Sequence, residues 1–204
     1  MEQHRRSRIP GKIDPDAWRY INTLISYSTA SAATVNVPAS VVDGDLMVMS
    51  YSTRNCTITA PAGWTWAASG DSSGGEVSAI YYRIASSEPA NYTWTLSGGY
   101  AAFLCAAYRG PKELTLARWI VNYEAAPSVI GLKQGLLVAV CGTAASSTNL
   151  TEFTGMTTVY AHYNGGNARV LQAYMNLTED AWTDTYPMNP TGLAYDGYSA
   201  ASFI

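Results

Sequence analysis

The sequence predicts an all-β fold, namely a jelly-roll-like antiparallel β-sandwich with an extended N-terminal arm. From residue 32 onward, short runs rich in β-branched and aromatic residues follow one another, and no long segment has the period of an amphipathic helix. The runs are separated by turn signals, which are Asp43-Gly44, Pro61-Ala62-Gly63, Gly98-Gly99, Asn164-Gly165-Gly166 and Asp196-Gly197. At 204 residues, the chain is long enough to bury the core of one such sandwich.

The runs show two kinds of hydrophobic pattern. In YTWTL, residues 92–96, the aromatic side chains and the leucine share one face and the threonines share the other, which is typical of a half-buried strand. Other runs are apolar on both faces, namely DLMVMSY at 45–51, AAFLCAAY at 101–108 and GLLVAV at 135–140. We expect these to be central strands that a second layer or a partner subunit covers.

The two halves of the chain also resemble each other. Segments match in pairs at offsets of about 90 to 98 residues. The pairs are GDLMVMSYST at 44 with QGLLVAVCGT at 134, PAGWTW at 61 with FTGMTT at 153, VSAIYYRIA at 77 with ARVLQAYMN at 168, and GYAAFLC at 99 with GYSAASF at 197. We interpret them as two four-stranded halves, which together would supply the two Greek keys of one jelly roll.

The N-terminal arm, residues 1–28, differs from the sandwich domain, residues 29–204. Residues 1–19 hold five basic residues against three acidic ones, a net charge of +2, whereas the rest of the chain holds seven against twelve, a net charge of −5. Prolines and a glycine keep the first stretch extended, after which Asp16 is expected to cap a short helical turn in DAWRYINTLI.

Three interpretations of the arm stay open: a strap that docks on a neighbouring subunit, a disordered end, and a nucleic-acid tail. We favour the strap, because an overall net charge of only −3 argues against nucleic acid as the main partner. The partner-binding residues that this interpretation assigns are Arg5, Arg6, Arg8, Trp18, Arg19 and Tyr20.

The cysteines and the apolar segments indicate the compartment. The chain has three cysteines, and Cys105 and Cys141 stand inside apolar runs, where a thiol packs as a small hydrophobic group. We therefore expect reduced, structural cysteines. The basic N-terminus is not followed by the apolar segment of a signal peptide, and no run approaches the ~18 apolar residues of a membrane span. The sequence thus predicts a protein that is made in a cytoplasm and has no membrane partner.

Four segments of the first half carry a family resemblance. In order, VPASVVDGDLMVM, PAGWTW, YYRIASSEPANYTWTLS and AAFLCAAYRG contain a Gly-Asp strand entry, a Gly-Trp turn, a hairpin with Arg and Glu-Pro, and a strand that ends in Tyr-Arg-Gly. This series resembles a β-sandwich domain of bacteriophage structural proteins and their prophage relatives. The resemblance covers residues 35–110 well, the second half loosely and residues 1–30 not at all. It implies a fold and a place in the virion, rather than a reaction.

Candidate catalytic and metal sites have weak support. Residues 70–74 match the G-x-S-x-G pattern of serine hydrolases around Ser72, but EVSAIYYRIA, which follows, alternates like a strand where a nucleophile elbow needs a helix. The chain has two histidines and no Cys-x-x-Cys pair for zinc. Asp43 and Asp45 could hold calcium, but carboxylates of a tight turn usually accept hydrogen bonds from local amides. We predict no catalytic residue, no cofactor and no metal, and hence no enzyme.

Aromatic residues crowd the first half, where exposed rings would suit a sugar platform. The residues are Trp64, Trp66, Tyr81, Tyr82, Tyr92, Trp94, Tyr100 and Tyr108. The strand pattern favours a place in the core or an interface, and Trp64 is expected to plug one end of the sandwich. Arg83 and Arg109 are expected to be structural ion-pair partners rather than substrate clamps.

Together these observations predict a non-enzymatic component of a phage particle, made in the host cytoplasm and located in the virion. Among virion roles we favour a capsid decoration (cement) protein, which binds the major capsid protein or other virion proteins and stabilises the shell. A homo-oligomer is expected, and a trimer would match the threefold sites of capsid lattices. Two alternatives stay open: a tail, baseplate or fibre-associated module of the same virion, and a carbohydrate-binding adhesin.

Overall fold

The computed structural model describes residues 18–28, 31–71, 75–110, 116–122, 135–143, 156–164, 168–176 and 196–203. Every regular element in these ranges is a β-strand, and the strands pair antiparallel. The prediction of an all-β fold with antiparallel sheets is therefore confirmed.

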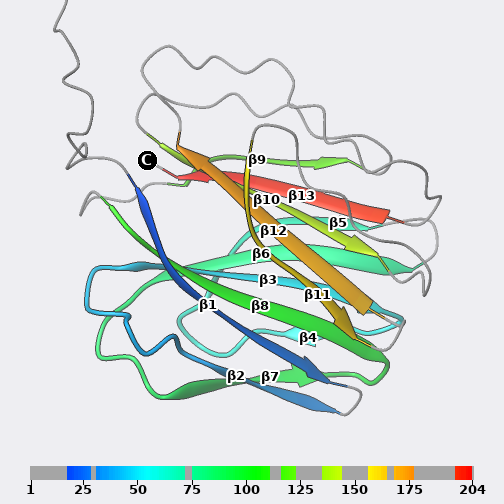
Figure 1. The fold of residues 1–204 in the computed structure, drawn as a ribbon. Helices are drawn as coiled ribbons and strands as arrows, with labels where there is room; N and C mark the ends of the chain where they lie inside the picture. Colours follow the sequence, from blue (N-terminus) through cyan, green and yellow to red (C-terminus); the bar gives the residue numbers. More distant parts are fainter. Residues whose placement is uncertain are drawn as a thin grey trace, which may run out of the picture.

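The strands form three stacked sheets (Figure 1). The central sheet contains, in spatial order, β1 (Arg19–Ser28), β8 (Tyr100–Arg109), β3 (Leu46–Arg54), β6 (Glu76–Ile84) and β5 (Thr65–Asp71). On one side lies the small sheet, made of β2 (Ala32–Asn36), β7 (Asn91–Leu96) and β4 (Ile58–Thr59). On the other side lies the distal sheet, made of β11 (Thr157–Asn164), β12 (Ala168–Asn176), β10 (Leu136–Thr143), β13 (Asp196–Phe203) and β9 (Leu116–Asn122).

A hydrophobic core fills the space on each face of the central sheet. Along β3, Leu46 and Val48 belong to the core shared with the distal sheet, whereas Met47 and Met49 belong to the core shared with the small sheet. All residues of β3 are buried except Arg54, which stands at its end. The expectation that strands apolar on both faces lie between layers is thus confirmed, because both layers come from this chain.

Strand β7 shows the half-buried pattern that its sequence predicts. Trp94 and Leu96 are buried in the core under the small sheet, whereas Thr93 and Thr95 are exposed. Trp94 is completely buried. The alternation therefore fixes which face of the small sheet meets the central sheet.

The first eight strands have a nested order of pairing. β1 pairs with β8, β2 with β7, and β3 with β6, as in a long hairpin that is wrapped into two sheets. β5 departs from this order, because it pairs with β6 at the edge of the central sheet. All eight strands lie before residue 110, so the prediction that each half has four strands is wrong.

The structure corrects two predictions about residues 1–28, namely the bounds of the N-terminal arm and the helical turn within it. Residues 19–28 form β1, which pairs with β8 from Arg19 opposite Arg109 to Ser28 opposite Ala101. A segment rich in β-branched and aromatic residues finds a partner strand there, and this pairing outweighs the local capping signal. The arm ahead of the sandwich is therefore residues 1–17, which lie outside the described residues, as does Asp16.

The predicted resemblance between the halves appears in the strand order. The matched segments place β10 with β3, β12 with β6, β11 with β5 and β13 with β8. The distal sheet, read β9-β13-β10-β12-β11, then has the same order as the central sheet, read β1-β8-β3-β6-β5. Residues 123–134, 144–155 and 177–195, which follow β9, β10 and β12, lie outside the described residues, so the comparison is limited to these two sheets.

Candidate functional site

The polar residues of the family-like motifs gather in two clusters at one end of the sandwich, where β3 begins. The Asp45 cluster joins the start of β3 to the end of β8. The Trp64 cluster joins the turn before β5 to the hairpin between β6 and β7. A shallow hollow lies between the loops that carry them.

In the Asp45 cluster, a buried carboxylate holds an arginine in a two-pronged contact. Arg109 donates from Nε to Oδ1 of Asp45 at 2.7 Å and from a terminal nitrogen to Oδ2 at 2.8 Å. The backbone N–H of Val42 also donates to Oδ2, at 2.9 Å, and the hydrogen bond with Asp45 raises the pKa of Arg109. The Asp45 side chain is only 2% exposed, so its charge depends on these donors.

In the Trp64 cluster, an arginine lies between two aromatic rings and a carboxylate. The guanidinium carbon of Arg83 lies 5.9 Å from the ring centre of Trp64 and 5.0 Å from that of Tyr92. Arg83 pairs with Glu88 at 2.9 Å, and the Tyr92 hydroxyl donates to the same carboxylate. Burial, together with Glu88, raises the pKa of Tyr92 to about 12. Gly63 precedes the tryptophan with φ +86°, and a Cβ there would lie 2.9 Å from Arg83.

These contacts confirm that Arg83 and Arg109 are structural ion-pair partners. Trp64 is 8% exposed and packs on Trp94 at 5.6 Å between ring centres, so it plugs one end of the core as predicted. Each carboxylate of the two clusters accepts hydrogen bonds on both oxygens. The arrangement therefore fixes loops and strand ends, and it does not present a carboxylate free to act as a general base.

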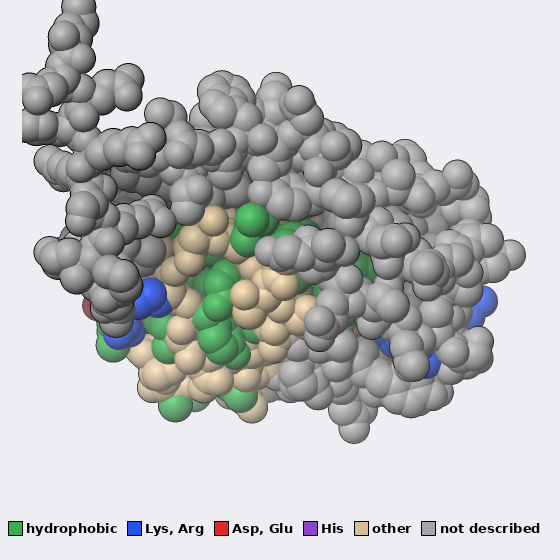
Figure 2. Space-filling view, turned by 45° about the horizontal axis from the view of Figure 1, so that its top comes forward, with side chains coloured by type: hydrophobic (Ala, Val, Ile, Leu, Met, Phe, Trp, Pro, Cys, Tyr) green, Lys and Arg blue, Asp and Glu red, His purple; other side chains and the backbone are tan. Residues whose placement is uncertain are grey.

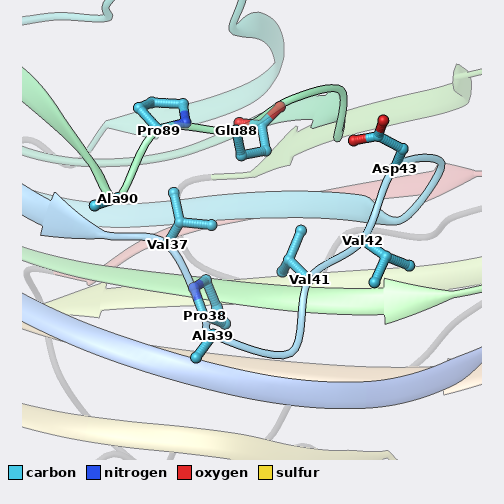
Figure 3. Close-up of a pocket in the computed structure, with 9 residues that line it drawn as sticks. All are labelled: Val37, Pro38, Ala39, Val41, Val42, Asp43, Glu88, Pro89 and Ala90. Atoms are coloured by element: carbon cyan, nitrogen blue, oxygen red, sulfur yellow. The ribbon is translucent and has the colours of Figure 1, made fainter.

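The hollow between the two clusters has a volume of about 210 Å³ (Figure 3). Its walls come from the loop between β2 and β3 and from the hairpin between β6 and β7. The lining residues are Val37, Pro38, Ala39, Val41, Val42, Asp43, Glu88, Pro89 and Ala90. The volume is smaller than the ~300 Å³ at which small-molecule pockets begin. The hollow is thus a depression of mixed polar and apolar surface rather than a pocket for a metabolite.

The two aspartates that were considered for calcium make local contacts. Asp43 accepts a hydrogen bond from the backbone N–H of Ser87 at 2.7 Å, and Asp45 binds Val42 and Arg109. Among the described residues there is no group of three or more His, Cys, Asp or Glu side chains that could hold a metal ion. Ser72, the serine of the hydrolase-like pattern, lies outside the described residues.

The structure separates the residues assigned to partner binding. Arg5, Arg6 and Arg8 lie outside the described residues. Trp18 is buried between the central and distal sheets, where a Cβ on Gly110 would lie 2.4 Å from its ring. Arg19 and Tyr20 are exposed, and the Tyr20 ring stacks on Tyr174 at 5.9 Å. Trp18 therefore anchors the start of β1. Of the assigned residues that the structure describes, only Arg19 and Tyr20 offer surface to a partner.

The aromatic residues are mostly packed in the core. Trp94 and Tyr108 are fully buried, whereas Trp66 is 40% and Tyr100 38% exposed. These two exposed rings stand on β5 and β8, three strand spacings apart and at levels of β3 that differ by five residues. They are thus on the order of 20 Å apart, which is too far for one sugar ring to touch both.

A buried polar chain between the layers was not anticipated from the sequence. Ser50 donates to the side-chain oxygen of Gln172 at 3.0 Å, and the amide of Gln172 donates to the Tyr108 hydroxyl at 2.9 Å. Burial raises the pKa of Tyr108 well above its usual value. A serine and a glutamine inside apolar strands were the available signal, but their pairing depends on how the sheets stack.

The remaining residue-level expectations concern thiols and membranes. Cys105 and Cys141 are buried thiols, as predicted, and burial raises the pKa of Cys105 to about 12. The part of the chain that the structure describes contains no helix long and apolar enough to cross a membrane.

Comparisons with protein-family models, with curated proteins and with solved structures return no match to this chain. The resemblance to phage structural proteins remains a prediction from the motifs, and the function rests on the site described above.

Proposed function

We propose that this protein is a non-enzymatic structural component of a bacteriophage particle, and specifically a capsid decoration protein that binds the major capsid protein or other virion proteins. The observation that carries the proposal is that the polar residues of the phage-like motifs bond to one another at one end of the sandwich. We expect the motif residues of a structural module to hold its loops and strands together, because such a module binds its partners through its surface and needs no catalytic site.

The surface supports docking through apolar contact. In Figure 2, the described residues in view are mostly apolar or uncharged, with basic side chains near the margins. At the end that carries the hollow, Val42 is 53% and Tyr20 37% exposed. Burial of such surface contributes ~25 cal/mol per Å², so several contacts of this kind would stabilise a shell against internal pressure.

The strap is now limited to residues 1–17. Trp18 is anchored by burial, and Asn176 donates a hydrogen bond to its backbone oxygen at 2.9 Å. Residues 1–17 hold four basic residues against three acidic ones, so their net charge is only +1. A segment tied to the sandwich at a fixed point can bind a neighbouring subunit, and a second contact of this kind adds avidity. The expected trimer follows from the threefold sites of a capsid lattice, and light scattering of the purified protein measures it.

The experiment is co-sedimentation of the protein with particles of the phage whose genome encodes it. A variant without residues 1–17 keeps Trp18 and β1, so we expect it to fold and to bind less tightly than the full chain. Deletion through residue 28 would remove β1 and test folding instead. Equal binding by the shorter variant would refute the strap, and no binding by the full chain would refute the proposal. Recovery on tails alone would move the function to the tail.

A further inference from the structure

We infer that the central and distal sheets are two copies of one module, packed through a self-complementary interface like the two subunits of a symmetric dimer. This inference is independent of the proposed function. It identifies the partner that the inner face of the central sheet fits, which is a second copy of the same sheet. In this chain, that copy is covalently attached.

A shared irregularity supports the equivalence. In the central sheet, Thr65 lies opposite Tyr82, and the register of β5 against β6 shifts between Trp66 and Ala68. In the distal sheet, Thr157 lies opposite Tyr174, and the register of β11 against β12 shifts between Thr158 and Tyr160. By these registers, each residue of β11 and β12 is 92 positions after its counterpart, which shifts the match of VSAIYYRIA with ARVLQAYMN by one residue. A β-bulge is a specific local feature, so its recurrence at the same place indicates a common module rather than two sheets of similar order.

The inner faces also correspond. Leu46 and Val48 of β3 point into the core between the two sheets, and so do their counterparts Leu136 and Val138 of β10. β3 lies between β8 and β6, and β10 lies between the equivalent strands β13 and β12. The same side of the module is therefore buried in both copies.

The contacts between the sheets are reciprocal. β8 packs on β12 and β6 packs on β13, where β12 is the counterpart of β6 and β13 is the counterpart of β8. In the same way, β1 contacts β11 and β5 contacts β9. An interface in which element i meets j and j meets i is isologous, and it implies a twofold axis between the copies.

The axis passes between β3 and β10, which are counterparts that face each other. Gly142 occupies the position in β10 that Ser52 occupies in β3. A Cβ on Gly142 would lie 2.5 Å from the Ser52 hydroxyl oxygen and 2.7 Å from its Cβ. A residue in contact with its own counterpart is what a twofold axis produces, and here one of the two must be a glycine.

The first test exchanges the two residues on the axis, in the full chain. Gly142→Ser alone should lower the urea midpoint of unfolding, because two serines then meet. Adding Ser52→Gly should recover more than half of that loss, because the serine and the glycine have only changed sides. Adding Ser50→Gly instead is the matched control, since Ser50 stands on the same strand away from this contact, and its effect should be additive.

The second test moves a polar contact to its symmetry-related place. Ser50 and Gln172 are hydrogen-bonded, and the register makes Val140 and Ile80 their respective counterparts. Val140→Ser and Ile80→Gln should each lower the midpoint, because each buries a polar group without its partner. The double variant should lose clearly less than the sum, since a twofold relation brings the new groups together. Additive losses in either test would overturn the inference.

Discussion

The ion pair between Asp45 and Arg109 predicts that removing the arginine destabilises the protein more than neutralising the aspartate. The carboxylate is 2% exposed and the arginine side chain 43%, so the two groups depend on each other to different degrees. Arg109→Ala leaves a buried charge with Val42 N–H as its remaining donor among the contacts described, whereas Asp45→Asn leaves an arginine that water can solvate.

The magnitudes follow from the two hydrogen bonds that the arginine donates to Asp45. A hydrogen bond to a charged group contributes ~1.5–3 kcal/mol when buried, and the exposure of Arg109 reduces this through solvent screening. We expect Arg109→Ala to lower the free energy of unfolding by about 2 kcal/mol and Asp45→Asn by about 1 kcal/mol. In the Asp45→Asn background, Arg109→Ala should cost no more than about 0.5 kcal/mol.

Urea unfolding followed by tryptophan fluorescence measures all three variants. Arg19→Ala is the matched control, because Arg19 is an exposed arginine opposite Arg109 in the sheet, and its effect should stay within about 0.5 kcal/mol. If Arg109→Ala lowers the free energy of unfolding equally in the wild-type protein and in the Asp45→Asn variant, the two residues are not coupled. That result would refute the reasoning.

Three further predictions concern backbone strain, thiols and pH. Gly63→Ala should destabilise the protein more than Gly44→Ala. Both glycines have a positive φ, but only at Gly63 would a new Cβ lie close to a side chain, 2.9 Å from a terminal nitrogen of Arg83. Equal urea midpoints of unfolding for the two variants would contradict this. In the native protein, the partly exposed Cys56 should react with a thiol reagent first, and the buried Cys105 and Cys141 only on unfolding; three equally fast thiols would contradict their burial. Folding raises the pKa of Cys105 from 9.0 to about 12, so the folded state keeps a proton that the unfolded chain releases. The contribution of Cys105 to stability should therefore be constant below about pH 9 and fall from there toward pH 12, and a urea midpoint that rises over this range would refute the assignment.

The sequence predicted the parts of the fold that depend on local pattern. The alternation in β7 gave its buried face, and the doubly apolar runs of β3 and β8 identified strands covered on both sides. Arg83 and Arg109 were recognised as ion-pair partners because each stands in or at the end of a strand otherwise rich in apolar residues. In these cases the neighbours along the chain already determine the environment of the side chain.

Features that depend on contacts across the fold were missed. Residues 19–28 carry a cap signal before them and a mixed apolar pattern, so only their pairing with β8 decides that they form a strand. The count of four strands in the first half left out β1, β2, β4 and β7, and of these the two-residue β4 is too short to leave a pattern. The Ser50–Gln172 contact joins residues 122 positions apart, and no local signal pairs them.

The three-layer arrangement limits which surfaces remain for partners. Both faces of the central sheet are covered by other sheets of the same chain. The virion partner that we propose would therefore contact surfaces other than the two faces of the central sheet. The end with the hollow combines exposed apolar side chains with the point where residues 1–17 join β1.

The most direct test of the proposed function is cryo-electron microscopy of purified particles from the source phage, with mass spectrometry of the same particles to identify this chain. The proposal predicts peptides of this protein in the particles and density for a three-layered sandwich on the outer surface of the capsid lattice. Absence of the chain from purified particles would contradict the virion assignment, and density confined to the tail would contradict capsid decoration.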